Sequence, residues 1–203
     1  MRVKYLVIGS FNSMDGVSKK IFSQIRALEK NGIQAELVLL TREKPKSIPG
    51  EISFRAEKTL SAPYRNTLEK VMSLFDIERK LSEEVKASSE GTIVYVRNLI
   101  PLPGLISTLK GKRKGKVVFE LQGFLDQEAK HRGSLSSVLG LRLFGGQILK
   151  HSDGIIGVTE EITRHYCQKS ANPSLVCFTN GNGFEVASVP QRVPPIFDGK
   201  HLN

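Results

Sequence analysis

Residues 1–10, MRVKYLVIGS, and the helix that follows them decide the fold. The apolar run at residues 5–8 is typical of a short buried strand. A polar loop follows and ends at Gly16, and apolar residues then recur at helical spacing over 17–28. Gly32 suits the left-handed conformation that ends many helices. The stretch therefore predicts a strand, a glycine-containing loop and a helix.

The start of this helix is a candidate anion site. The first amides of a helix lack partners, and the helix dipole favours negative charge there. Gly16 has no Cβ, so a ligand can approach the backbone closely. The spacing from Gly9 to Gly16 matches neither the dinucleotide-binding fingerprint nor the P-loop. Two interpretations stay open, a phosphate site and a plain turn before a capped helix.

Length and composition indicate one sizeable globular domain. The chain has 203 residues, 39% hydrophobic and 25% charged. No run of 18 apolar residues predicts a membrane span, and the N-terminal apolar run is too short for a secretory signal. The two cysteines, Cys167 and Cys177, indicate no disulfide framework. We expect buried apolar thiols and a cytoplasmic protein.

The net charge of +10 favours phosphate-bearing ligands, nucleic acid or an anionic membrane surface. The densest basic run, residues 110–116, precedes an apolar strand, so it falls at the amino edge of a parallel sheet, opposite the ligand side. It is either a solvated loop or a contact for a membrane or an acidic partner. No aromatic residues interleave with it, which argues against binding of single-stranded nucleic acid.

Apolar strands alternate with helices along the whole chain. Strands are expected at 34–41, 51–55, 92–97, 116–120, 154–158 and 175–179, and helices at 62–87, with a break near Asp76, and at 134–150. Continuous apolar strands indicate an α/β fold, a Rossmann-like parallel sheet with helices on both faces. The helix over 134–150 is unusually apolar, so it is either buried between layers or faces a lipid-linked acceptor or membrane.

Polar residues follow several of these strands. They comprise the loop 9–16, Arg97, the segment 120–128, the segment 159–161 and the turn 180–183. Because ligands bind at the carboxyl ends of parallel strands, these groups predict a cleft. Three prolines, Pro190, Pro194 and Pro195, then indicate a linker over 189–203 after a domain of residues 1–188.

Five segments in this order resemble the N-terminal half of a GT-B glycosyltransferase of the retaining family four. They are MDGVSKKI at 14–21, IVYVR at 93–97, VVFELQG at 117–123 with Glu128 downstream, SDGIIGVTEE at 152–161 and NGNGFEV at 180–186. The resemblance implies a second Rossmann-like domain that holds the nucleotide sugar and begins about where this chain stops. We therefore expect an acceptor-side half that does not turn over sugar alone.

The resemblance assigns roles to a few residues. Asp15, Gly16 and Val17 match the loop whose amides meet the donor diphosphate. Glu120, Gln122 and Glu128 match the catalytic segment near the donor sugar and acceptor. Many relatives carry a histidine where this chain has Gln122, which leaves the donor sugar open.

Arg97 and Arg132 are candidates for binding an acidic acceptor group, although Arg97 pairs equally well with Glu120. Transfer with retention needs charge stabilisation on the leaving diphosphate and tight positioning more than a strong base. The four histidines lack metal-ligand spacing, so we expect neither a metal nor another cofactor.

The function expected from the sequence is that of a nucleotide-sugar-dependent hexosyltransferase. Its acceptor would be a glycan or a lipid-linked group in bacterial polysaccharide or glycolipid synthesis, with no nucleic acid partner. The enzyme would be cytoplasmic, with peripheral contact at the inner face of the membrane. The alternative is a non-catalytic Rossmann-like module that binds a nucleotide or an acidic partner through its basic surface. A dehydrogenase fits less well, because the glycine fingerprint is absent.

Overall fold

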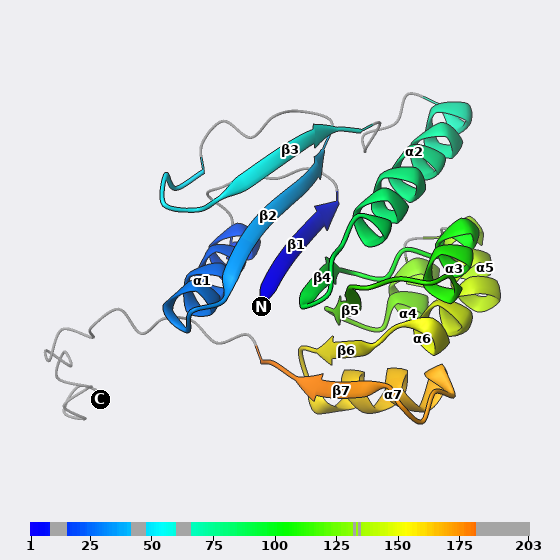
Figure 1. Ribbon diagram of the computed structural model, residues 1–203. Helices are drawn as coiled ribbons and strands as arrows, with labels where there is room; N and C mark the ends of the chain where they lie inside the picture. The colour runs from blue at the N-terminus through cyan, green and yellow to red at the C-terminus, as the bar shows by residue number, and fades with distance from the viewer. Residues whose placement is uncertain (9–15, 42–47, 60–65, 132, 134, 182–203) are drawn as a thin grey trace, which may run out of the picture.

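The computed structural model describes residues 1–8, 16–41, 48–59, 66–131, 133 and 135–181. The strands are β1 (Arg2–Ile8), β2 (Gln34–Thr41), β3 (Phe54–Lys58), β4 (Thr92–Arg97), β5 (Lys116–Leu121), β6 (Gly154–Gly157) and β7 (Val176–Thr179). They form one parallel sheet in the order β3-β2-β1-β4-β5-β6-β7 (Figure 1). The strand order reverses direction between β1 and β4, which is the point where ligands bind in open α/β sheets.

Helices cover both faces of this sheet. They are α1 (Gly16–Lys30), α2 (Thr67–Lys86), α3 (Pro103–Lys110), α4 (Leu125–His131), α5 (Leu135–Gly140), α6 (Gly146–His151) and α7 (Glu160–Ser170), with a π-helical turn, η1 (Leu141–Gly145), between α5 and α6. Figure 1 shows α1 on one side and α2, α3 and α6 on the other. The α/β, Rossmann-like architecture expected from the sequence is therefore present.

Apolar side chains that point alternately to the two faces of the sheet form two hydrophobic cores. On one face, Tyr5 and Leu37 pack with Ile21 and Ile25 of α1. On the opposite face, a larger core joins strand residues such as Phe119 to apolar side chains of α2, α3, α6 and α7. Because neighbouring residues of a strand point to opposite faces, both layers draw on the same apolar runs.

Helix α2 differs from its expected form. It runs unbroken from Thr67 to Lys86, so the expected break near Asp76 is wrong. The apolar stripe drifts because Leu68, Met72 and Phe75 are exposed and do not join the core. The Asn66 side chain caps the helix by accepting a hydrogen bond from the Glu69 amide at 2.8 Å.

The expected helix over 134–150 is present as the consecutive segments α5, η1 and α6. Leu141, Ile148 and Leu149 are buried against the main core. Leu139 and Leu143 are exposed to 58% and 57%, so the helix is not buried on all sides.

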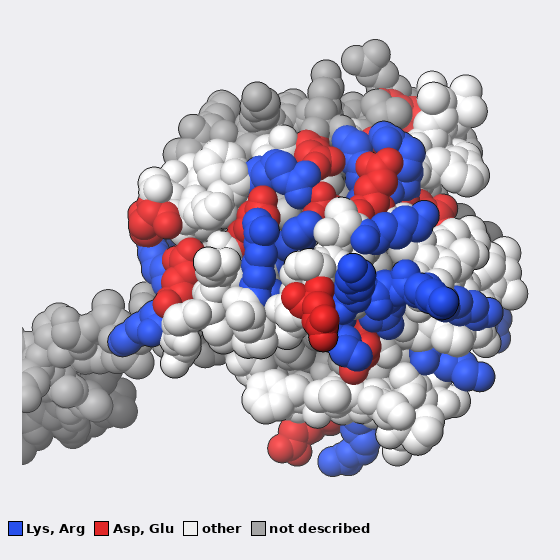
Figure 2. All heavy atoms as spheres, viewed as in Figure 1, with Lys and Arg blue, Asp and Glu red and all other residues white. Residues whose placement is uncertain are grey.

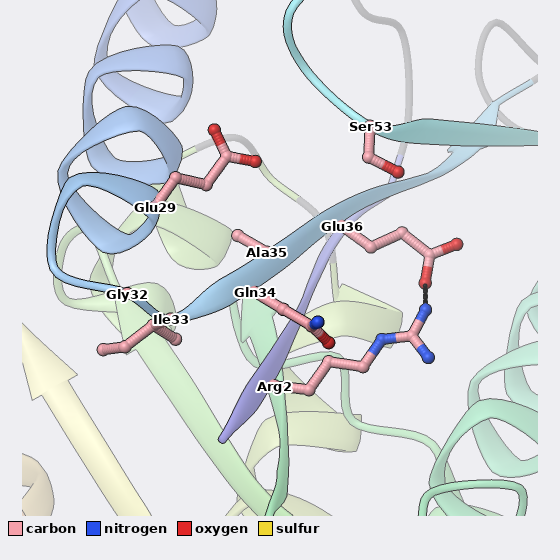
Figure 3. A pocket seen from close by; sticks show the side chains of 8 residues that line it. All are labelled: Arg2, Glu29, Gly32, Ile33, Gln34, Ala35, Glu36 and Ser53. Carbon is pink, nitrogen blue, oxygen red and sulfur yellow. Dashed lines mark hydrogen bonds and ion pairs between the residues drawn. The ribbon is translucent and has the colours of Figure 1, made fainter.

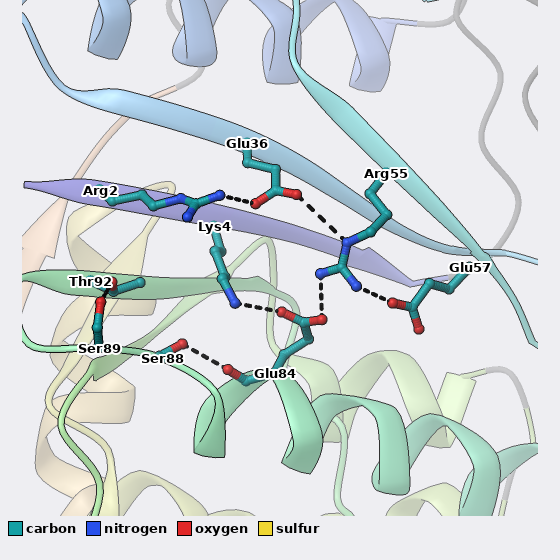
Figure 4. Close-up of polar contacts among 9 residues, drawn as sticks. All are labelled: Arg2, Lys4, Glu36, Arg55, Glu57, Glu84, Ser88, Ser89 and Thr92. Carbon is teal, nitrogen blue, oxygen red and sulfur yellow. Dashed lines mark hydrogen bonds and ion pairs between the residues drawn. The ribbon is translucent and has the colours of Figure 1, made fainter.

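A network of ion pairs connects α2 to the sheet (Figure 4). The Glu84 carboxylate lies 2.9 Å from Lys4 Nζ and also pairs with Arg55. Arg55 in turn pairs with Glu57 and with Glu36, which binds Arg2 at 2.7 Å. Burial alone raises the pKa of Glu84, but the hydrogen bonds and charges of Lys4 and Arg55 lower the pKa overall.

Replacing Glu84 by glutamine is expected to lower the free energy of unfolding at pH 7 by about 1–2 kcal/mol, because Lys4 and Arg55 lose their shared anion. The lowered pKa means that this stabilisation is full above the ordinary carboxyl range and is lost as the pH falls below it. Urea unfolding of both proteins checks this as the pH is lowered from 7 to 3. A difference between them that stayed constant with pH would contradict it.

The expectation for the cysteines is wrong. Cys167 of α7 and Cys177 of β7 form a disulfide, with their Cα atoms 6.4 Å apart. The two positions are 10 apart in the sequence, and no spacing pattern predicts that they pair. The inference from unpaired thiols to a reducing compartment therefore loses its basis.

Reducing this disulfide is expected to lower the free energy of unfolding by about 2–3 kcal/mol, because closing a short loop limits the unfolded chain. Urea unfolding with and without a reductant measures the difference. The variant Cys167→Ser with Cys177→Ser serves as the control, since its stability should not respond to the reductant. Equal stability of the oxidised and reduced chains would contradict the expectation.

Candidate active site

Glu120 lies at the centre of a polar cluster at the carboxyl ends of β4 and β5. Its side chain is fully buried, which is rare for a carboxylate without partners. The register pairs Arg97 with Glu120 and Tyr5 with Tyr95, so these four side chains share the sheet face that α1 covers. The buried anion is thus placed where the strand order reverses.

Two cations neutralise this carboxylate. Lys20, from the second turn of α1, places Nζ 3.0 Å from Glu120 Oε1. Arg97, at the end of β4, places Nη1 3.5 Å from Oε2. Arg97 is 8% exposed, so its charge is also largely removed from water. The pairing of Arg97 with Glu120, one of the two expectations for this arginine, is present.

Tyrosines complete the surroundings of Glu120. The Tyr5 hydroxyl lies 2.8 Å from Glu120 Oε2, to which it donates, and 2.6 Å from the side-chain amide of Gln24. The Tyr95 ring stacks on Tyr5 with 4.5 Å between the ring centroids. Burial and the nearby Glu120 charge raise the pKa of both tyrosines, so both stay protonated. Tyr5 can therefore act only as a neutral hydrogen-bond donor to the carboxylate.

The protonation state of Glu120 follows from this balance. Burial raises the pKa of a carboxyl group, but the charges of Arg97 and Lys20 and the Tyr5 hydroxyl outweigh it and lower the pKa. Glu120 is therefore an anion at neutral pH. Two cations around one anion leave the cluster with a net charge of +1.

The segment after β5 is held in place by side chains from two directions. Gln122 accepts a hydrogen bond from Arg97 Nη2 at 3.1 Å. A Cβ at Gly123 would lie 2.1 Å from Glu128 Oε1, so a side chain at this position would displace the carboxylate. The Tyr166 hydroxyl accepts from the Leu125 amide at 2.8 Å and donates to the Gly123 carbonyl at 3.3 Å, and burial raises its pKa to about 12.

The first turn of α1 lies at the same edge. Gly16 begins the helix, and a Cβ built on it would meet no atom of the described residues within 4 Å. Val17 is 47% exposed. Because Lys20 of this helix reaches Glu120, the start of α1 lies beside the ends of β4 and β5. Open space in front of Gly16 leaves room for a ligand at the amino end of the helix dipole.

The structure brings several predicted site residues together. Arg97, Glu120 and Gln122 are in direct contact, and Gly16 and Val17 begin the helix that supplies Lys20. Glu128 lies one helical turn further, against Gly123. Asp15, Arg132 and the segment 182–203 lie outside the described residues. The roles assigned to all these residues stay predictions.

Three residues of the cluster, Tyr5, Lys20 and Gln24, were not predicted as site residues from the sequence. Tyr5 lies in an apolar strand, so its position in the sequence indicates a core residue. Lys20 and Gln24 recur at an interval of four in α1, which places them on one side of that helix. This interval is a usable signal, but it does not identify Glu120, a hundred residues away, as the partner.

A pocket lies at the amino ends of β1 and β2, opposite the Glu120 cluster (Figure 3). The end of α1, the start of β2 and Ser53 border it, and Arg2 and Glu36 close one side through their ion pair. Arg2 and Glu36 neutralise each other, and Glu29 adds a negative charge to the lining, which disfavours an anionic ligand. The pocket also lies at the amino edge of the sheet. We therefore place the candidate site at the carboxyl edge.

The described residues contain neither a candidate metal site nor a membrane-spanning helix. No group of three or more His, Cys, Asp or Glu side chains is arranged to hold a metal ion in that part of the chain. None of the helices described is both long enough and apolar enough to cross a membrane.

Comparison with known proteins supports the fold. The chain is similar to the solved structure of the lipopolysaccharide outer core galactosyltransferase WaaB in its apo form, with 13% identity and a TM-score of 0.53. The match covers 86% of this chain and 44% of that one. A second similar structure is an alpha-glucosyltransferase in complex with UDP and a 13-mer DNA, with 14% identity, a TM-score of 0.49 and coverage of 87% and 41%.

The match to WaaB confirms the expected α/β fold with its Rossmann-like parallel sheet. The chain spans less than half the length of the solved structures it matches. No protein-family model matches the sequence, and no curated protein matches it.

Proposed function

We propose that this chain is the acceptor-side domain of a glycosyltransferase that takes its sugar from a nucleotide diphosphate sugar. One observation carries the proposal: the open first turn of α1 and the cationic cluster of Lys20 and Arg97 lie together at the carboxyl edge of the sheet. The amino end of a helix dipole and a net positive charge both favour a diphosphate.

The residues of the cluster have different proposed roles. The amides of Gly16 and Val17 meet the diphosphate oxygens, and Lys20 adds positive charge behind them. Glu120 is ionised and enclosed by its partners, so it holds Lys20 and Arg97 in position and gives up no proton. We thus reassign Glu120 from a catalytic to a positioning role. Gln122 and Glu128 keep the predicted place beside the reacting sugar and the acceptor.

The finer parts of the proposal follow the resemblance to family four. Residues 1–188 form the domain, 189–203 lead to a second domain that binds the nucleotide sugar, and neither half transfers sugar alone. Transfer proceeds with retention, to a glycan or lipid-linked acceptor whose acidic group Arg97 and Arg132 bind. Catalysis then rests on charge stabilisation and positioning and needs no metal.

Expression of the chain extended through the coding sequence after Asn203 tests this function. We expect a second α/β domain, and release of nucleoside diphosphate from one member of a panel of nucleotide sugars. Proton NMR of the product should show the anomeric configuration of the donor. The 203-residue chain alone, as control, should show no release.

Two results would contradict the proposal. One is the absence of any second domain in the extended chain. The other is tight, sugar-independent nucleotide binding by the 203-residue chain with no transfer by the extended protein. The latter would favour the alternative, a non-catalytic nucleotide-binding module.

A further inference from the structure

The helix formed by α5, η1 and α6 carries an exposed stripe of mixed character. Its exposed positions over 139–150 are Leu139, Arg142, Leu143, Gln147 and Lys150. They recur at intervals of three and four, so they line one outward face. Leu139 and Leu143 expose 58% and 57% of their surface, although Leu141, Ile148 and Leu149 on the other side are buried. The stripe is therefore a convex, half-apolar surface.

Arg113 joins the basic run to the end of this helix. Its Nε donates to the Leu109 carbonyl at 3.3 Å, and its Nη2 donates to the His151 carbonyl at 2.9 Å. The guanidinium thus ties the ends of α3 and α6 together. Burial lowers the pKa of His151, and the charges of Lys110, Lys150 and Arg113 lower it further. These cations are close enough to act on one imidazole.

Most of the cations gathered here have no counter-charge. Among the described residues, no hydrogen bond or ion pair involves the side chains of Lys110, Lys112, Lys114 or Lys150. Asp153 neutralises only Arg113 and Lys116. Figure 2 shows Lys and Arg side chains gathered right of centre, over the region of α3 and α6 in Figure 1. Together with the stripe, these lysines form a surface that we call the leucine–lysine face.

We propose that the leucine–lysine face docks on an anionic lipid bilayer. Lysines near such a bilayer are attracted without directional contacts, and exposed leucines on a convex helix can enter the headgroup boundary. Nucleic acid is disfavoured, because recognition of single strands uses aromatic side chains and the leucines would stay in water. An acidic protein fits less well, because the leucines lie on an outward helix face and form no groove.

This inference goes beyond the proposed function, because it concerns a different surface. The leucine–lysine face runs along α5, η1 and α6 to the end of α3, and its lysines lie towards the amino end of β5. The carboxyl edge with Glu120 therefore stays open when the lysines meet lipid. Bilayer docking needs neither a nucleotide sugar nor a second domain, so each proposal can fail alone.

Vesicle sedimentation of the 203-residue chain tests the proposal. We expect binding to phosphatidylcholine vesicles that contain 30% phosphatidylglycerol, no binding to pure phosphatidylcholine, and weaker binding at higher salt. Replacing Lys110, Lys112 and Lys150 by glutamine should weaken binding about 100-fold. The matched control removes Lys19, Lys30 and Arg164, three exposed cations outside this face, and should weaken binding far less.

A second variant tests the leucines. Leu139→Gln with Leu143→Gln keeps every charge and should weaken vesicle binding at least tenfold, with the circular dichroism spectrum unchanged. Two results would overturn the proposal in favour of diffuse attraction by net charge. One is an equal loss of vesicle binding in the variant of Lys110, Lys112 and Lys150 and in its control. The other is unchanged binding by the leucine variant. Competition by poly-glutamate or RNA at charge concentrations equal to the lipid, with binding independent of the leucines, would also overturn it.

Discussion

Replacing Glu120 by alanine is expected to lower the free energy of unfolding by about 3–5 kcal/mol. The change leaves Lys20 and Arg97 largely buried, with side chains only 13% and 8% exposed, and without their shared anion. It also leaves the Tyr5 hydroxyl without its carboxylate acceptor. Urea unfolding at pH 7 measures the loss.

Glu83→Ala is the matched control for this prediction. Glu83 pairs with Arg79 at 3.0 Å, but both side chains are about 60% exposed, at 58% and 61%. Water replaces such a pair readily, so the loss should stay below about 1 kcal/mol. Because its pKa is lowered, Glu120 should contribute fully at neutral pH and progressively less as the pH falls below the ordinary carboxyl range. Similar losses in the two variants would contradict a buried ion cluster.

Replacing Gly16 by valine is expected to weaken binding of nucleoside diphosphate about 10- to 100-fold without destabilising the fold. A Cβ at this position meets no atom of the described residues within 4 Å, so the domain should tolerate the substitution. It would occupy the space through which diphosphate oxygens reach the first amides of α1. Isothermal titration with UDP measures the affinity, and urea unfolding measures the stability.

Gly50→Val supplies the control for the Gly16 variant. A Cβ at Gly50 also meets no atom within 4 Å, and the residue is exposed. This variant should bind UDP as the unchanged chain does. Unchanged affinity in Gly16→Val would remove the helix start from the site, although the fold would stand.

Much of the fold could be predicted because its strands are buried on both faces. The strands at 34–41 and 92–97 have the bounds expected from their apolar runs. The exposed edge is less regular, and β3 covers Phe54–Lys58 where 51–55 was expected. Arg55 pairs with Glu57 of the same strand and with Glu84 of α2, and such charged residues carry no apolar signal.

The site could be predicted only where its residues follow the strands. Arg97 and Glu120 could be paired because each ends a buried strand, and parallel strands end at one edge. Lys20 and Tyr5 could not, because their contacts with Glu120 depend on how α1 crosses the sheet. The disulfide between Cys167 and Cys177 likewise depends on the packing of α7 beside β7.

Amide chemical shifts of the isotopically labelled chain, titrated with UDP, test the central claim most directly. The claim is that a diphosphate binds at the start of α1, at the carboxyl edge of the sheet. We expect the largest shifts at the amides of Gly16, Val17 and Lys20, with little change around Gln34 and Glu36 at the opposite edge. Shifts confined to Gln34 and Glu36, or none at millimolar UDP, would contradict the claim.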